Sequence, residues 1–144
     1  MRITRRTWLI AFSTLLAGCS GAPASTAADE KAWQGTWKLV DATYDGEPQP
    51  GDMAWVVDGD RYRIRLDGQL HVDTQTFRLD AGRKTIDVFH HETPPGTFGG
   101  SLKGIYAISG DALAVCYDLT GQAYPAAFEA PRGSRRVLYH FRRE

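Results

Sequence analysis

Residues Ser101–Asp118, SLKGIYAISGDALAVCYD, contain the pattern that decides the fold. A two-residue turn at Gly110-Asp111 separates two runs in which apolar side chains alternate with smaller or polar ones. Side chains of the two runs that face each other across such a turn lie on one side of the sheet. The apolar face consists of Tyr106, Ile108, Leu113, Val115 and Tyr117, and the thinner face contains Ala107, Ala114 and Cys116. This stretch therefore predicts an antiparallel β-hairpin with one buried face.

Several other segments have a strand-like pattern and are separated by turns rich in Gly, Pro and Asp. They are Thr36–Tyr44, Ala54–Asp58, Arg61–Leu66, the stretch with Phe77 and Leu79, Thr85–His90 and Val137–Arg142. Together with the hairpin they make about eight short strands, and no segment of the domain shows a helical period. A sheet of this kind leaves exposed edges unless it closes on itself. We therefore expect an all-β domain, either a small antiparallel up-and-down barrel or a strongly curled half-barrel.

The segment Arg61–Leu66, RYRIRL, alternates charged and apolar residues and ends at a turn formed by Asp67-Gly68. A three-residue loop would place Leu70 opposite Ile64 and would keep apolar side chains on one face. We expect that register, followed by a bulge near residues 73–75 that corrects the phase of the next apolar residues.

The first residues form a targeting segment. Residues 1–18 contain three arginines and then an apolar run from Trp8 to Ala17, which is the order of a secretion signal. The run is shorter than the roughly 20 residues that span a bilayer as a helix, so a membrane anchor helix is the weaker interpretation. The arginine pair also resembles a twin-arginine export signal, and the export route stays open.

Leu16-Ala17-Gly18-Cys19 resembles the bacterial lipobox. The resemblance implies that the signal peptide is cut before Cys19 and that this cysteine carries acyl chains, such as palmitate, that anchor it in a membrane. Ser20 directly follows Cys19, and a serine at this position resembles lipoproteins that are sorted to the outer membrane. The resemblance therefore implies a lipoprotein of the cell envelope, held at the periplasmic face of the outer membrane.

The remaining chain divides into a tether and a domain. Residues 19–32 are small, polar and interrupted by proline, which is typical of a flexible tether. The ordered β-domain is expected over residues 33–144. Because Cys19 is used for lipid attachment, Cys116 has no partner for a disulfide, and a lone cysteine in a strand is usually a small buried hydrophobic residue.

Segments distributed over nearly all of residues 33–144 resemble an uncharacterised family. They are WQGTWKLVDATYDGEP, VVDGDRYRI, KTID at residues 84–87, GIYAISGDALAVCYD, Tyr124-Pro125 with Phe128, and the final VLYHFRRE. Their order is similar to that in the lipocalin-like domain family abundant in Planctomycetes, in which a cysteine often stands at the position of Cys116. The resemblance implies a small lipocalin-like barrel and no established activity, and it supplies no catalytic residue.

Gly35-Thr36-Trp37 also resembles the G-x-W motif that opens lipocalin barrels. The resemblance implies that Trp37 closes one end of the barrel and that an arginine from a late strand stacks on its indole ring. Arg136 and Arg142 are the candidates for that arginine.

No known catalytic motif, phosphate-binding loop or zinc-ligand spacing is present in the sequence. His90 and His91 are neighbours in a predicted strand, so they point to opposite faces and do not easily share a metal ion. Without residues 1–18 the chain has 14 basic and 17 acidic residues, with no basic cluster of the kind that binds nucleic acid. We expect no catalysis, no cofactor, no metal and no nucleic-acid partner.

Two functions fit these observations. The first is a lipid-anchored binding module that holds one small apolar ligand, with Tyr62, Tyr106 and Tyr117 as candidates for lining its cavity. The second is an interaction with a periplasmic protein, as an inhibitor, an immunity protein or an accessory subunit of an envelope complex.

Overall fold

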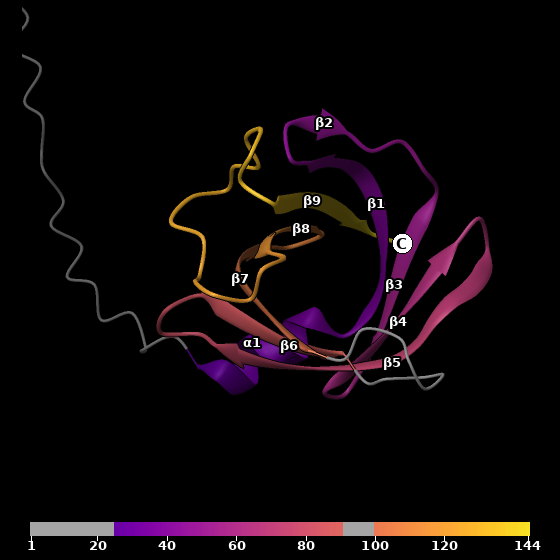
Figure 1. The fold of residues 1–144 in the computed structure, drawn as a ribbon. Coiled ribbons are helices and arrows are strands. Elements are labelled where there is room, and N and C mark those ends of the chain that lie inside the picture. Colours follow the sequence, from indigo (N-terminus) through magenta and orange to yellow (C-terminus); the bar gives the residue numbers. More distant parts are fainter. Residues whose placement is uncertain (1–24, 91–99) are drawn as a thin grey trace, which may run out of the picture.

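The computed structural model describes residues 25–90 and 100–144, with the backbone alone for residues 71–74 and 90. The chain forms a closed antiparallel barrel, which confirms the predicted all-β fold and excludes the half-barrel (Figure 1). The barrel strands are β1 (Gly35–Tyr44), β3 (Met53–Asp58), β4 (Arg61–Leu66), β5 (Gln69–Asp80), β6 (Thr85–His90), β7 (Gly100–Ser109), β8 (Ala112–Asp118) and β9 (Arg136–Arg143). Each barrel strand pairs with the next along the chain, and β1 pairs with β9 to close the ring. The short β2 (Glu47–Pro48) pairs with the end of β1.

The predicted hairpin is confirmed as β7 and β8. Tyr106 lies opposite Val115 and Ile108 opposite Leu113, with Gly110-Asp111 as the turn between the strands. Tyr106, Val115 and Leu113 are at most 2% exposed, so the apolar face of the hairpin points into the barrel.

The expected register between β4 and β5 is wrong at the turn, and Leu70, which was expected opposite Ile64, lies opposite Arg65 and is 54% exposed. The loop has two residues, Asp67 and Gly68, both with positive φ, because such a turn matches the twist of the strands. A shift in β5 then brings Val72, instead of Leu70, opposite Ile64. A second register shift lies between the partners of Tyr62 and Ile64, as the phase of the sequence predicted.

Strand β1 contains a bulge that changes which residues face the barrel interior. Its pairing with β9 shifts between Leu39 and Asp41, and Val40 lies at the shift with 60% of its surface exposed. Because of this extra residue, Leu39 and Ala42 both line the interior although they are three positions apart.

The chain before the barrel differs from the predicted tether. Residues Thr26–Trp33 form helix α1, capped by the side chain of Ser25, which accepts a hydrogen bond from the amide of Ala28. Trp33 is the one residue of α1 that is fully buried. The helix therefore has no stripe of apolar side chains, and its sequence shows no helical period of apolar residues. Within residues 25–90 and 100–144, no helix is long and apolar enough to cross a bilayer.

Helix α1 distinguishes the two ends of the barrel (Figure 1). The closed end contains α1 and the turns β3–β4, β5–β6 and β7–β8. Residues of the helix bond to Ala81 and Tyr106 there, and the residue that follows the helix, Gln34, bonds to Gly59. The opposite end, which we call the mouth, contains the β1–β3 connection, the β4–β5 turn and the β8–β9 segment. Aromatic side chains fill the space between the closed end and the middle of the barrel; they are Trp33, Trp37, Trp55, Tyr62, Phe77, Tyr106, Tyr117 and Phe141.

Candidate functional site

The closed end is held by a single arginine that differs from the predicted candidates. The guanidinium of Arg143 lies 4.2 Å from the centre of the Trp37 ring. Its two terminal nitrogens donate hydrogen bonds of 2.6 Å to the carbonyl oxygens of Ala32 and Gln34, at the carboxyl end of α1. The indole nitrogen of Trp37 donates to the carbonyl of Trp33 at 2.7 Å. A cation at the carboxyl end of a helix satisfies carbonyls that lack partners within the helix.

The predicted arginines, Arg136 and Arg142, do not contact Trp37. They lie on the outer face of β9, because side chains alternate along a strand and the inward positions of β9 are occupied by Val137, Phe141 and Arg143. A late-strand arginine therefore does stack on Trp37, but it is Arg143, and both named candidates are wrong.

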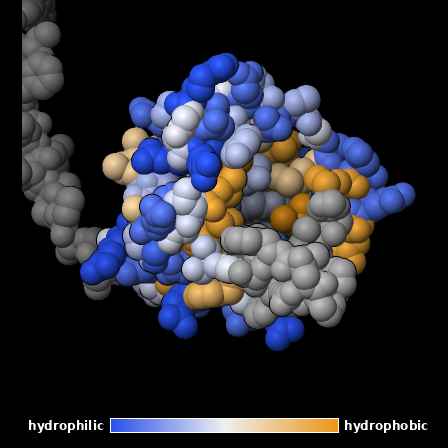
Figure 2. Space-filling model, in the orientation of Figure 1, coloured by the Kyte–Doolittle hydropathy of each residue, from blue (hydrophilic) through white to orange (hydrophobic). Residues whose placement is uncertain are grey.

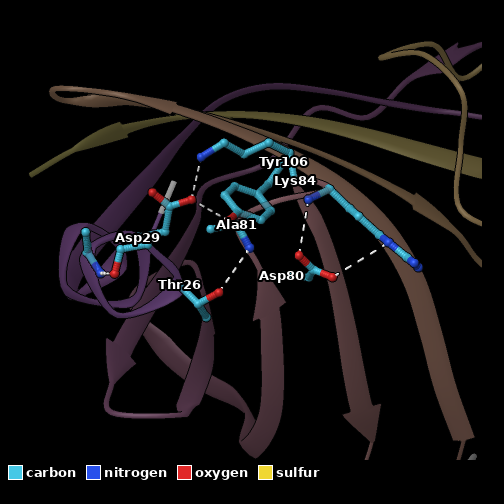
Figure 3. A network of polar contacts seen from close by, with 9 residues as sticks. Thr26, Asp29, Asp80, Ala81, Lys84 and Tyr106 are labelled. Carbon is cyan, nitrogen blue, oxygen red and sulfur yellow. Dashed lines mark hydrogen bonds and ion pairs between the residues drawn. The ribbon is translucent and has the colours of Figure 1, made fainter. Parts of the chain in front are cut away.

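A second contact fixes the middle of α1 to the barrel (Figure 3). The carboxylate of Asp29 accepts hydrogen bonds from the ammonium of Lys84 at 2.6 Å and from the hydroxyl of Tyr106 at 2.5 Å. Burial opposes ionisation of Asp29, but the hydrogen bonds from Lys84 and Tyr106 outweigh it and lower the pKa of Asp29. Burial and the neighbouring carboxylate raise the pKa of Tyr106. The Thr26 hydroxyl accepts a hydrogen bond from the Ala81 amide beside this contact.

The mouth contains a pocket with a volume of about 270 Å³. In Figure 2, hydrophobic side chains gather around a hollow in this face of the molecule. The described residues that line the pocket are Leu39, Ala42, Tyr44, Gln49, Pro50, Gly51, Met53, Leu66, Leu119, Val137 and Tyr139. None of these lining residues carries a charge, and the polar groups of their side chains come from two tyrosines and one glutamine. The pocket therefore suits a neutral and largely apolar molecule.

The inner wall of this mouth pocket is aromatic. Tyr139 lines the pocket, and its ring centre lies 5.6 Å from that of Trp55 and 6.3 Å from that of Tyr117. Trp55 in turn stacks on Tyr62 at 4.8 Å and contacts Phe141 at 4.4 Å. Because these rings fill the barrel below Tyr139, the mouth pocket does not continue to the closed end.

The three tyrosines predicted to line a cavity are all buried, but none of them lines the mouth pocket. Tyr62 donates a hydrogen bond of 2.8 Å to the side-chain oxygen of Gln75, and Tyr106 bonds to Asp29 at the closed end. Tyr117 lies next to Tyr139, one layer behind the pocket wall. The alternation identified these residues as interior, but it did not show at which height the interior is empty.

Cys116 is fully buried on the outer face of β8, where its sulfur lies 3.4 Å from the carbonyl oxygen of Glu129 in the β8–β9 segment. Burial raises the pKa of the Cys116 thiol, so the reactive thiolate is disfavoured at neutral pH. The predicted lipidation residue, Cys19, lies outside the described residues.

Among the residues whose side chains are described, no group of three His, Cys, Asp or Glu is placed to hold a metal ion. The pair His90 and His91 lies outside those residues. Comparisons of the chain with models of protein families, with curated proteins and with solved structures found no match.

Proposed function

We propose that this chain is a lipid-anchored binding module of the cell envelope, without catalytic activity, that holds a small apolar molecule in the mouth pocket. The observation that carries the proposal is the position of the pocket. It lies at the end of the barrel opposite α1, and the described side chains that line it are uncharged. A volume of about 270 Å³ is slightly below the range of roughly 300–1,000 Å³ that holds drug-sized ligands, so the ligand is small or inserts one end.

The proposal includes the envelope location and membership of the lipocalin-like family. Both are supported by the sequence: the lipobox ending at Cys19, and the segments that resemble the family from Trp33 to the last strand. Helix α1 begins seven residues after Cys19, so an acylated Cys19 would hold the barrel within about 25 Å of the bilayer surface. The proposed location is the periplasmic face of the outer membrane.

Binding of a fluorescent apolar probe, phenylnaphthylamine, tests the pocket. The chain from residue 19 onward, with Cys19→Ser to prevent acylation, is titrated with the probe as wild type and as Ala42→Phe. Ala42 is 5% exposed and lines the pocket, so a phenyl ring there fills the space that the probe needs. We expect a saturable fluorescence increase that Ala42→Phe weakens at least tenfold.

The matched control is Ala107→Phe, which adds the same ring at an exposed position on the outer face of β7. This variant should bind the probe like the wild type. Equal probe binding by all three proteins, or no binding by the wild type, would contradict the proposal.

The alternative is a protein-interaction role, and a surface feature supports it. A shallow apolar groove of about 290 Å³ runs over the outside of β7, β8, β9 and β1. Small or aliphatic side chains from Val40, Ala107 and Ala114 line it. In that case Ala107→Phe, and not Ala42→Phe, should abolish the function in cells, because it disrupts the outer surface and leaves the mouth intact.

A further inference from the structure

The chain enters helix α1 on one particular side of the barrel. The hydroxyl of Thr26, the first residue of α1, accepts a hydrogen bond of 3.2 Å from the amide of Ala81 in the turn between β5 and β6 (Figure 3). Cys19 stands seven residues before Thr26 in the sequence, so an anchor on Cys19 lies within about 25 Å of this turn. The β5–β6 side of the closed end is therefore the side nearest the proposed anchor.

Arginines project from the outer face of the strands on this side. Along β4 they alternate with Tyr62, which is buried in the barrel, so they point outward. Two more are exposed, one on β5 and one in the β5–β6 turn. These five residues, which we call the basic face, are Arg61, Arg63, Arg65, Arg78 and Arg83.

The distribution of charge along the chain sets this side apart. Residues 61–90 contain six Lys or Arg and four Asp, whereas residues 25–60 contain two Lys and eight Asp or Glu. The part of the chain that forms β4, β5 and β6 is therefore net positive, and the part that forms α1, β1 and β3 is net negative.

The described acidic groups leave these arginines accessible to a further anion. The carboxylate of Asp60 lies 3.9 Å from Arg61, and that of Asp80 lies 3.9 Å from Arg83. Such long ion pairs between exposed side chains contribute little stability. Asp87 lies opposite Arg78 in the sheet, but its carboxylate accepts hydrogen bonds from the hydroxyl of Tyr124 and lies 3.6 Å from the ammonium of Lys103.

Two exposed apolar side chains lie on the same outer face. Leu70 lies opposite Arg65 and is 54% exposed, and Phe89 lies opposite Thr76 and is 38% exposed. They stand near the mouth on β5 and β6, the strands whose other ends meet the start of α1. Surfaces that combine cations with exposed apolar side chains bind to the interface of anionic membranes.

We infer that the outer face of β4, β5 and β6 lies on the bilayer that holds the anchor, where the basic face contacts anionic phosphate headgroups and Leu70 and Phe89 enter the interface. This inference rests on the lipid anchor of the proposed function. A short tether keeps the domain at a high local concentration near the surface, so weak individual contacts are sufficient to orient it. In this orientation the barrel lies on its side, and the mouth opens along the bilayer instead of away from it.

Labels on opposite sides of the barrel test this orientation. The acylated chain with Leu70→Cys or Val40→Cys is labelled with the fluorophore NBD and inserted into vesicles of phosphatidylcholine and phosphatidylglycerol that contain doxyl-labelled lipid. The positions are matched, since both carry an exposed aliphatic side chain, and Val40 lies on β1, four strands from β6 in the closed ring. Cys116 is buried and acylation blocks Cys19, so neither takes the label.

We expect the doxyl-labelled lipid to quench the label at position 70 about threefold more strongly than the label at position 40, because only the first enters the interface. Equal quenching, or stronger quenching at position 40, would overturn the inference and leave the anchor and the pocket of the proposed function intact. A chain that does not float with the vesicles would show that the anchor itself is absent, and the inference would fail with it.

A second pair of variants tests the contact with the headgroups. Arg65→Gln with Arg78→Gln removes two cations of the basic face, and the control, Lys38→Gln with Arg142→Gln, removes two exposed cations that lie opposite each other on β1 and β9. We expect the first double variant to reduce the quenching at position 70 about twofold and the control to leave it unchanged. Vesicles of phosphatidylcholine alone, or high salt, should reduce the quenching as well. Equal quenching in the two double variants, or undiminished quenching without phosphatidylglycerol, would overturn the contact between the arginines and the headgroups.

Discussion

The guanidinium of Arg143 lies 4.2 Å from the centre of the Trp37 ring, which joins the last strand of the barrel to the first. The same guanidinium bonds to the backbone carbonyls of Ala32 and Gln34, so one side chain connects β9, β1 and the carboxyl end of α1. This contact closes the end of the barrel opposite the mouth.

Arg143→Met should destabilise the protein by about 2–3 kcal/mol, because hydrogen bonds from a charged donor and a cation–π contact are lost together. The measurement is urea denaturation followed by tryptophan fluorescence. The control is Arg142→Met, which removes an exposed arginine on the outer face of β9 and should change stability by less than about 0.5 kcal/mol. Equal effects of the two substitutions would show that Arg143 does not hold the closed end.

Asp29→Asn should destabilise the protein by about 1 kcal/mol at neutral pH, since Asp29 accepts hydrogen bonds from Lys84 and Tyr106 and solvent partly screens the lysine. The folded-state pKa of Asp29 is lowered, so its contribution is complete above the unfolded value of about 4 and is lost as pH falls through the folded value. The stability difference between wild type and variant should therefore shrink between neutral pH and about pH 3.

Denaturation curves at several pH values check this expectation. Glu30→Gln is the control, since the side chain of Glu30 is exposed on the same helix and forms no hydrogen bond or ion pair with the described residues. A difference for Asp29→Asn that stays constant down to about pH 3 would contradict the proposed role of the ionised carboxylate.

Gly104→Ala should destabilise the barrel by about 1–3 kcal/mol, because a Cβ at this position would lie 2.5 Å from a ring carbon of Tyr117 and 2.9 Å from the carbonyl oxygen of Cys116. Gly51→Ala is the control, since no atom lies within 4 Å of a Cβ there. Thermal unfolding of the two variants distinguishes them. A Gly104→Ala protein as stable as Gly51→Ala would mean that the Tyr117 ring moves freely, contrary to the packing described above.

Cys19→Ala should release the full chain from the membrane fraction of the bacterial cells that produce it. The physical reason is that acyl chains on this cysteine supply the proposed anchor, and the described residues contain no helix that could replace it. The measurement is fractionation followed by immunoblotting. The control is Cys116→Ala, which removes the other cysteine, buried in the domain, and should leave the protein in the membrane fraction. Unchanged fractionation of Cys19→Ala would exclude the lipid anchor.

The alternation of apolar residues was sufficient to predict the strands and the inward face of the hairpin, because burial requires one consistent face along each strand. The same rule applied to β9 would have identified Arg143, which is in phase with Val137 and Phe141. Arg136 and Arg142 are out of phase with these inward residues, so strand alternation alone separates them from Arg143.

Neither helix α1 nor the mouth pocket could be predicted from the sequence. The helix is held by Trp33, by Asp29 and by carbonyls that bond to Arg143, and these contacts leave no periodic pattern. The pocket depends on the bulge at Val40, which turns both Leu39 and Ala42 inward, and on the height at which the aromatic rings end. Such features arise from the packing of side chains from distant strands.

The most direct test of the central claim is mass spectrometry of organic extracts of the full chain, purified from the envelope of the cells that produce it. We predict a neutral apolar compound that co-purifies with the wild type in near-stoichiometric amount and is lost from Ala42→Phe, in which the pocket is filled. Ala107→Phe should retain it. Extracts that contain no such compound, or that contain it equally in all three proteins, would contradict a ligand in the mouth pocket.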